Sequence, residues 1–321
     1  YALFGAVCSA VMLYGLSLLY GFTGSLEFTA RAHIGGLSAT PPLLTMLALL
    51  LVFTGIGFKL SFVPFHFWSP DVYQGAPTPV TAFLSTAPKI AGIALLVRVL
   101  YAWPQDSAPA ESLYLLLLIS AIATMLLGNL AALRQENVKR MMAYSSIGHT
   151  GFLMMAVLAY RDSDPSVLLF YLAIYAIMNM GVFMLVDYIE SRTGATDLTG
   201  YKGLGRLLPA ALVCFVILLV SLTGLPPTAG FVSKLLVFSS VVDQWQATGD
   251  PGLLVLLIVG ALTTVISLFY YFKVPLNAFL KQPDRTLEVA SVSAAPLWLI
   301  VALTVAALVL GIFPQVLIDW L

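Results

Sequence analysis

The chain has 321 residues, of which 60% are hydrophobic and 9% are charged, and its mean hydropathy is +0.98. These values exceed what the surface of a soluble domain tolerates, so they indicate a polytopic membrane protein. Basic and acidic residues balance at 15 each, and no basic patch is left to bind a nucleic acid. Cys8 and Cys214 lie in separate apolar runs and are expected to pack rather than to bind a metal or form a redox pair.

Nine apolar segments are long enough to cross a bilayer, which requires about 20 residues per helix. The sequence therefore predicts an all-α membrane protein and a single membrane domain over residues 1–321. The chain begins at Tyr1, already inside an apolar run, which predicts a fragment that lacks its first helices. The expected segments are residues 1–21, 43–72, 78–101, 112–133, 138–159, 167–189, 207–242, 253–278 and 294–314.

Two of these segments are too long for a single crossing and contain helix breakers. Pro64 interrupts the second segment, and Gly224, Pro226 and Pro227 interrupt the seventh. Proline removes a backbone donor and clashes with the preceding turn, so each segment is predicted to be a discontinuous helix. Unwound backbone at membrane depth requires a covering of protein or water.

The two breaks lie five segments apart, so the chain is expected to cross the second one in the opposite direction. Paired interrupted helices in matching halves are typical of inverted-repeat transporters. On this hypothesis, residues 1–21 end the first half before its broken helix. Residues 43–101 hold that broken helix and the helix after it, and residues 112–321 form a second five-helix repeat with its broken helix at 207–242.

Basic residues in short loops favour the cytoplasmic side and therefore predict the orientation. Tyr1 is expected on the cytoplasmic side, and the C-terminus on the opposite side, of a bacterial inner membrane or an equivalent energy-transducing membrane. The residues expected at the cytoplasmic side are Arg134, Lys139, Arg140, Arg192, Lys202, Arg206, Lys281 and Arg285, against Arg31 and Arg161 on the other side and Arg98 near a helix end.

Three lysines, Lys59, Lys89 and Lys234, lie well inside apolar segments, without a carboxylate at comparable depth. A charged side chain near the bilayer centre costs about 2.5 to 3.5 kcal/mol and usually marks an ion pathway or a proton relay. We expect these lysines to transfer protons rather than to extend to the interface. Lys273 lies near a helix end, where an interfacial position fits as well as a role in proton exit.

The histidines and two acidic residues need separate interpretations. His66 follows the first break, where water and freed backbone groups meet, and is expected in the proton path. His149 lies beside hydroxyl side chains, which fits a proton relay as well as a neutral histidine of the core. His33 is expected in a loop without a role. Asp71 is interpreted as a turn or helix-end residue, and Glu190 as a solvated one.

The run from Gly57 to Pro77, GFKLSFVPFHFWSPDVYQGAP, resembles the signature of the antiporter-like membrane subunits of respiratory complex I, the proton-pumping NADH:quinone oxidoreductase. Its DVYQGAP ending, and the lysine of GFVSK at residues 230–234, are similar to the N subunit rather than to its L and M relatives. NVKR at residues 137–140 and AYSSI at residues 143–147 also match. The resemblance covers essentially the whole chain.

The resemblance implies a proton-translocating subunit without redox centres, in an antiporter-like fold of which this chain would hold the last nine helices. It implies that Lys59 pairs with a glutamate on a helix preceding Tyr1, that Lys89 carries the proton onward and that Lys234 serves the second half-channel. His66 and His149 would join the hydrated axis between them. No cofactor is expected in this chain, whereas NADH, FMN, iron-sulfur clusters and quinone would belong to partner subunits. The expected neighbours are M-type and small membrane subunits and lipid.

Two other functions are compatible with the same residues. A subunit of a multisubunit sodium/proton antiporter would share the broken helices and the lysines, and would couple sodium flux to proton movement without an electron donor. A structural membrane scaffold would need none of the lysines for activity. No catalytic, cofactor or metal motif occurs in the sequence.

Overall fold

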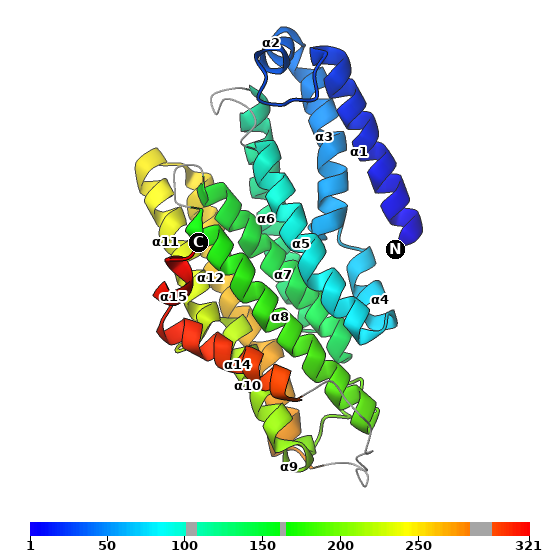
Figure 1. The fold of residues 1–321 in the computed structure, drawn as a ribbon, viewed down its shortest axis with the longest axis vertical. Coiled ribbons are helices and arrows are strands. Elements are labelled where there is room, and N and C mark those ends of the chain that lie inside the picture. The colour runs from blue at the N-terminus through cyan, green and yellow to red at the C-terminus, as the bar shows by residue number, and fades with distance from the viewer. Residues whose placement is uncertain (101–107, 161–164, 283–296) are drawn as a thin grey trace.

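The computed structural model describes residues 1–100, 108–160, 165–282 and 297–321, and its elements are helical (Figure 1). Arg161 and Arg285 lie outside the described residues. The helices are α1 (Ala2–Thr23), α2 (Arg31–Ala39), α3 (Pro42–Leu60), α4 (Trp68–Gly75), α5 (Thr78–Leu100), α6 (Ala108–Ala132), α7 (Val138–Ala159), α8 (Ser166–Thr193), α9 (Leu204–Leu207), α10 (Pro209–Thr223), α11 (Ala229–Thr248), α12 (Pro251–Tyr271), α13 (Lys273–Pro275), the π-helical turn η2 (Leu276–Leu280), α14 (Leu297–Ile312) and α15 (Gln315–Ile318).

The helices confirm the predicted all-α membrane fold. Among the described residues, seven helices are long and apolar enough to cross a membrane. They are α1, α3, α5, α6, α7, α8 and the segment from α12 to η2, and α10 and α14 are shorter apolar helices. Each of the nine expected segments therefore overlaps one helix or a run of two or three consecutive helical elements.

Both predicted breaks are present. The first separates α3 from α4 and begins at Ser61, whose φ is 58°. The second separates α10 from α11 and begins at Gly224, whose φ is 88°. In Figure 1, α3 and α4 lead away from the end of the molecule that carries α2, whereas α10 and α11 lead away from the end that carries α9. The two broken helices therefore run in opposite directions, as expected of inverted repeats.

Helix α7 lies at the centre of the bundle, since 94% of the residues in its most apolar stretch are buried. Glycines allow α6 to approach it closely: a Cβ on Gly128 would lie 2.5 Å from the backbone nitrogen of Gly148, and one on Gly151 would lie 2.4 Å from Cγ of Met125. Helix α7 also contacts α4, α5, α8, α11 and α12. Its polar side chains can therefore bridge several helices.

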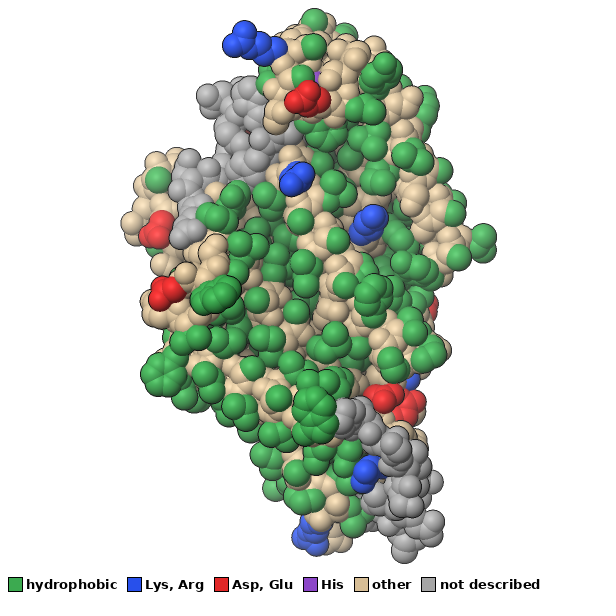
Figure 2. All heavy atoms as spheres, in the orientation of Figure 1, with side chains coloured by type: hydrophobic (Ala, Val, Ile, Leu, Met, Phe, Trp, Pro, Cys, Tyr) green, Lys and Arg blue, Asp and Glu red, His purple; other side chains and the backbone are tan. Residues whose placement is uncertain are grey.

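Apolar side chains cover most of the face shown in Figure 2, and charged side chains on it are few. Large apolar side chains are exposed on several helices, and those of Phe83 in α5 and Phe269 in α12 are 59% and 61% exposed. This distribution is the reverse of that in a soluble protein and is expected where the surrounding medium is lipid.

Helix α2 corrects one prediction, because His33 was expected in a loop. His33 is instead a fully buried residue of α2, and its Nδ1 lies 2.9 Å from the carbonyl oxygen of Ser25. The helix packs onto the end of α1, where a Cβ on Gly36 would lie 2.7 Å from Cα of Thr23. A helix of nine residues is too short to give the long apolar run by which the other helices were found.

Candidate functional site

The amine of Lys89, in α5, is fully buried and is surrounded by oxygen atoms of α7. Nζ donates hydrogen bonds to the carbonyl oxygen of Ser146 at 2.7 Å, to the hydroxyl of Ser146 at 2.6 Å and to the hydroxyl of Thr150 at 2.8 Å. The Ser146 hydroxyl also lies 2.7 Å from the hydroxyl of Tyr175 in α8. Three oxygen partners match the three donors of an ammonium group. The hydroxyls among them can both accept and donate a proton.

Thr150 connects Lys89 to the first helix break. Its one hydroxyl hydrogen can be donated to the carbonyl oxygen of Leu60, the last residue of α3, at 3.1 Å or to that of Ser146 in α7 at 3.0 Å. The last carbonyls of a helix have no partner within that helix, and the left-handed conformation of Ser61 ends α3 here. The break therefore supplies an oxygen atom to the polar cluster around the lysine, as expected of unwound backbone at membrane depth.

His149, one turn along α7 from Ser145, has hydroxyl partners from two other helices. Its Nδ1 lies 2.9 Å from the hydroxyl of Tyr171 in α8, and its Nε2 lies 3.3 Å from the hydroxyl of Tyr271 in α12. The Ser145 hydroxyl contacts the same Tyr271 hydroxyl. Both ring nitrogens are thus hydrogen-bonded, which satisfies a core histidine and equally suits a proton relay.

Lys234, in α11, lies beside the second break. It is 5% exposed, and its Nζ donates to the carbonyl oxygen of Thr223, the last residue of α10, at 2.8 Å. Nζ also lies 4.8 Å from the ring centroid of Phe152 in α7, a distance at which a cation is attracted to the face of a ring. A Cβ on Gly224 would lie 2.7 Å from Cδ of Lys234. Gly224 therefore both permits the left-handed turn and leaves room for the lysine.

Lys59 occupies a different environment, because its side chain is exposed. It lines a cleft of about 370 Å³ together with Tyr1 and residues of α1, α3, α4 and α5. The nearby break carries His66, which is 5% exposed and whose ring lies 4.3 Å from that of Phe67. Its Nδ1 has no hydrogen-bond partner among the described residues. The cleft gives Lys59 room for a polar partner from outside the described helices.

Lys273 lies at the end of α6 rather than in the central cluster. Its Nζ donates to the carbonyl oxygen of Leu133, which follows the last residue of α6, and its own carbonyl oxygen accepts a hydrogen bond of 2.7 Å from Asn277. A cation is favourable at the C-terminal end of a helix. This contact supports the interfacial interpretation of Lys273.

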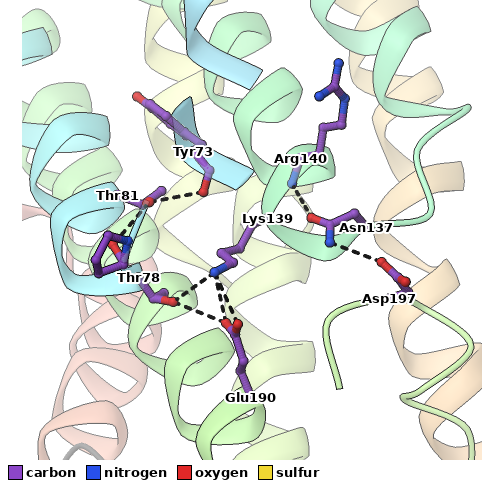
Figure 3. Close-up of polar contacts among 9 residues, drawn as sticks. Tyr73, Thr78, Thr81, Asn137, Lys139, Arg140, Glu190 and Asp197 are labelled. Carbon is purple, nitrogen blue, oxygen red and sulfur yellow. Dashed lines mark hydrogen bonds and ion pairs between the residues drawn. The ribbon is translucent and has the colours of Figure 1, made fainter. Parts of the chain in front are cut away.

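Two ion pairs lie at the beginning of α7. Nζ of Lys139 lies 3.1 Å from Glu190 of α8, and both side chains contact the hydroxyl of Thr78 in α5, at 3.4 Å and 3.3 Å respectively (Figure 3). Arg140 binds Asp71 of α4 at 2.5 Å. The position of Asp71 in the first turn of α4 agrees with its interpretation as a helix-end residue. The prediction of a simply solvated Glu190 is wrong, because its helix end packs against α5 and α7.

The central helix therefore brings three of the six predicted residues together. The ring of Tyr175 lies between His149, at 5.6 Å between ring centroids, and Nζ of Lys89, at 6.0 Å from its centroid. The ring centroid of His149 also lies 6.4 Å from that of Phe152, over which Lys234 is placed. Lys59 and His66 lie at the first break, and Lys273 lies at the end of α6.

Most of the partners of these residues could not be assigned from the sequence. The hydroxyl partners are Ser146, Thr150, Tyr171, Tyr175 and Tyr271. Ser145, Ser146, His149 and Thr150 follow helical spacing and share one side of a helix. Tyrosines at residues 171 and 175 show the same four-residue spacing. The described residues contain no group of three or more His, Cys, Asp or Glu residues that could hold a metal ion.

Comparison with known proteins identifies the family. Residues 1–267 match the family model described as "NADH:quinone oxidoreductase/Mrp antiporter, TM". The chain belongs to this family of membrane subunits. Its relatives include "NADH-quinone oxidoreductase subunit N 2" of Chloroherpeton thalassium, 43% identical over 289 residues that cover 88% of this chain and 56% of the relative. Another is "NAD(P)H-quinone oxidoreductase subunit 2" of Synechococcus, 44% identical over 286 residues that cover 89% of this chain and 52% of the relative.

Solved structures of NADH:quinone oxidoreductase/Mrp antiporter subunits show the same fold. A chain of respiratory complex I from Thermus thermophilus with bound aureothin is 34% identical, with a TM-score of 0.79 over 99% of this chain and 67% of that chain. A chain of the Mrp complex from Dietzia is 22% identical, with a TM-score of 0.82 over 99% of this chain and 65% of that chain. The solved structures confirm the antiporter-like fold, and the relative from Chloroherpeton thalassium confirms the resemblance to subunit N. The chain spans about half the length of the curated relatives named above.

Proposed function

We propose that the chain translocates protons within a complex I assembly and that Lys89, His149 and Lys234 carry them. The observation that supports this most strongly is the direct coordination of Lys89 by the hydroxyls of Ser146 and Thr150 inside the bundle. A hydroxyl group can accept a proton on one side and release another on the other side. Buried amines in such surroundings can therefore gain and lose protons without a carboxylate beside them.

The two helix breaks support the same proposal. The carbonyl oxygen of Leu60 reaches the Lys89 cluster through Thr150, and the carbonyl oxygen of Thr223 accepts a hydrogen bond from Lys234. The breaks thus place backbone acceptors at corresponding positions of two oppositely directed helices. In this proposal, each break forms one half of a proton path, and His149 lies between the halves.

In the proposed assembly, this chain has no redox centre of its own. NADH, FMN, iron-sulfur clusters and quinone belong to partner subunits, and other membrane subunits adjoin the exposed apolar faces. The membrane is a bacterial inner membrane or an equivalent one, with the end that carries Lys202 and Arg206 on the cytoplasmic side. We also propose that Lys59, which lines the cleft beside the first break, pairs with a carboxylate there.

The test is NADH-driven proton uptake into inverted membrane vesicles that carry Lys89→Ala or Lys234→Ala. The proposal predicts that both variants assemble but lose at least about half of their proton uptake. Unchanged uptake in both would favour a structural scaffold. Lys281→Ala, at an exposed lysine, is the matched control.

A second arm of this test distinguishes the antiporter function. Proton movement is measured without NADH, in the presence and absence of a sodium gradient. Sodium-dependent proton flux without an electron donor would contradict the proposal and indicate a sodium/proton antiporter. The proposal predicts no such flux.

A further inference from the structure

Helix α5 carries a row of buried polar side chains that ends at Lys89. Thr78, Thr81, Ser85 and Lys89 follow one another at intervals of three and four residues, which places them on one face of the helix. None of the four is more than 4% exposed, whereas Phe83 on the opposite face is 59% exposed. At 1.5 Å per residue, this polar row is about 16 Å long. It connects the lysine in the bundle interior with one end of the helix.

The ion pair of Lys139 and Glu190 lies at the other end of the polar row. Both charged side chains contact the hydroxyl of Thr78, the first residue of the row (Figure 3). The side chain of Lys139 is 9% exposed and that of Glu190 is 30% exposed. The carboxylate therefore reaches the solution, while its basic partner is buried. A carboxylate in this position can exchange protons with water and remain connected to the interior.

Further hydroxyls lie between the two ends of the polar row. Thr81 donates a hydrogen bond of 3.1 Å to the carbonyl oxygen of Tyr73 in α4 (Figure 3). Helix α4, which carries Ser69 and Tyr73, packs against α7, whose Ser146 binds Lys89. The hydroxyls of Tyr73 and Ser69 are fully buried and have no hydrogen-bond partner among the described residues. Buried polar groups of this kind commonly bind ordered water.

We propose that Glu190 and Lys139 form a proton-loading site that supplies Lys89 along the polar row. A proton from the aqueous phase adds to the Glu190 carboxylate and gives a neutral carboxylic acid, which weakens the ion pair with Lys139. The proton then passes along hydroxyls and bound water, each of which accepts one proton and releases another. It reaches the free amine of Lys89, which becomes an ammonium group, and Glu190 returns to a carboxylate. This inference rests on the proposed function of Lys89.

The neighbouring ion pair provides a matched control. Arg140 and Asp71 lie at the same end of α7, but the Asp71 side chain is 73% exposed, and Arg140 also binds Gln74 rather than the polar row. Exposed pairs of this kind contribute little to stability. Asp71→Asn therefore removes an ion pair of similar geometry without changing the row.

The experiment measures NADH-driven proton uptake and NADH oxidation in inverted vesicles containing the assembled complex. The variants are Glu190→Gln, Glu190→Asp, Thr81→Val, Asp71→Asn and Lys89→Met. The proposal predicts that Glu190→Gln and Thr81→Val each reduce proton uptake at least about fivefold. Glu190→Asp keeps a titratable carboxylate and is expected to retain more than half of the uptake, and Asp71→Asn is expected to match the unmodified complex.

Two results would overturn the proposal. Normal uptake in both Glu190→Gln and Thr81→Val, together with loss in Lys89→Met, would reject the loading site and leave the proposed function intact. Normal uptake in Lys89→Met would reject both. If the complex with Glu190→Gln fails to assemble, proton uptake by the Thr81→Val complex decides between the two outcomes. That substitution replaces a hydroxyl by a methyl group of similar size and leaves the ion pair in place.

Discussion

At the scale of single residues, the hydroxyl of Thr150 joins two features that are distant in the sequence. It lies 2.8 Å from Nζ of Lys89 and 3.1 Å from the carbonyl oxygen of Leu60. Since all three groups are buried or belong to buried residues, none of them can exchange a lost partner for bulk water. Removing this one hydroxyl would leave the remaining buried groups with one partner fewer. The loss of folding stability is then the free energy of keeping those groups away from water.

Thr150→Val is expected to destabilise the protein by about 1 to 3 kcal/mol, because it leaves a buried amine and a carbonyl with one partner fewer. The measurement is the thermal melting temperature of the purified complex in detergent. Thr54→Val is the control, since the Thr54 hydroxyl only donates to the carbonyl oxygen of Leu50 in its own helix. Equal melting temperatures for the two variants would contradict the assigned role of Thr150.

The burial and the partners of the charged side chains were only partly predictable from the sequence. Lys89 and Lys234 are buried, as expected from their positions inside apolar segments. Lys59 has equally apolar neighbours in the sequence, but its side chain lies in a cleft. Hydropathy describes what surrounds a residue along the chain and not which helices adjoin it. For the same reason, the pairing of Glu190 with Lys139 could not be inferred.

At the scale of helices, the second break depends on a very close backbone contact. A Cβ on Gly230, at the start of α11, would lie 1.7 Å from the carbonyl oxygen of Ser221 near the end of α10. The amide of Gly230 also donates to the Ser221 hydroxyl at 3.1 Å. The two halves of the broken helix can therefore meet only where no side chain stands between them.

Gly230→Ala is expected to cost at least about 2 kcal/mol and to reduce the amount of assembled complex, because backbone atoms cannot move aside as a flexible side chain does. Native gel electrophoresis of solubilised membranes measures this amount. Gly35→Ala in α2 is the matched control: a Cβ there meets nothing within 4 Å, and alanine favours a helix over glycine. Unimpaired assembly of Gly230→Ala would show that the two halves are not packed this way.

Helix positions were the most predictable part of the fold. Long apolar runs located the spanning helices, and Pro64, Gly224, Pro226 and Pro227 located both breaks, because these residues act on the backbone locally. Helix α2 was missed, since nine residues are fewer than a crossing requires. The central position of α7 was also not predictable. Its enclosure depends on glycines at which α6 and α7 approach each other closely. The sequence does not show which two helices lie side by side.

At the scale of the whole molecule, polar groups that belong to distant parts of the chain meet around α7. The Lys89 cluster reaches the first break, and Lys234 reaches the second. His149 lies between them, beside the rings of Tyr175 and Phe152 that the two lysines also approach. This arrangement requires all the surrounding helices to pack on α7. Proton movement is therefore expected to depend on the whole bundle within its assembly.

The most direct test of this central claim is the number of protons translocated per NADH oxidised by the complex reconstituted in liposomes. Lys89→Met is compared with Lys281→Met, which changes an exposed lysine. We expect Lys89→Met to lower this ratio while the complex remains assembled, and Lys281→Met to leave it unchanged. An unchanged ratio in assembled Lys89→Met complex would contradict the claim that protons pass through this lysine.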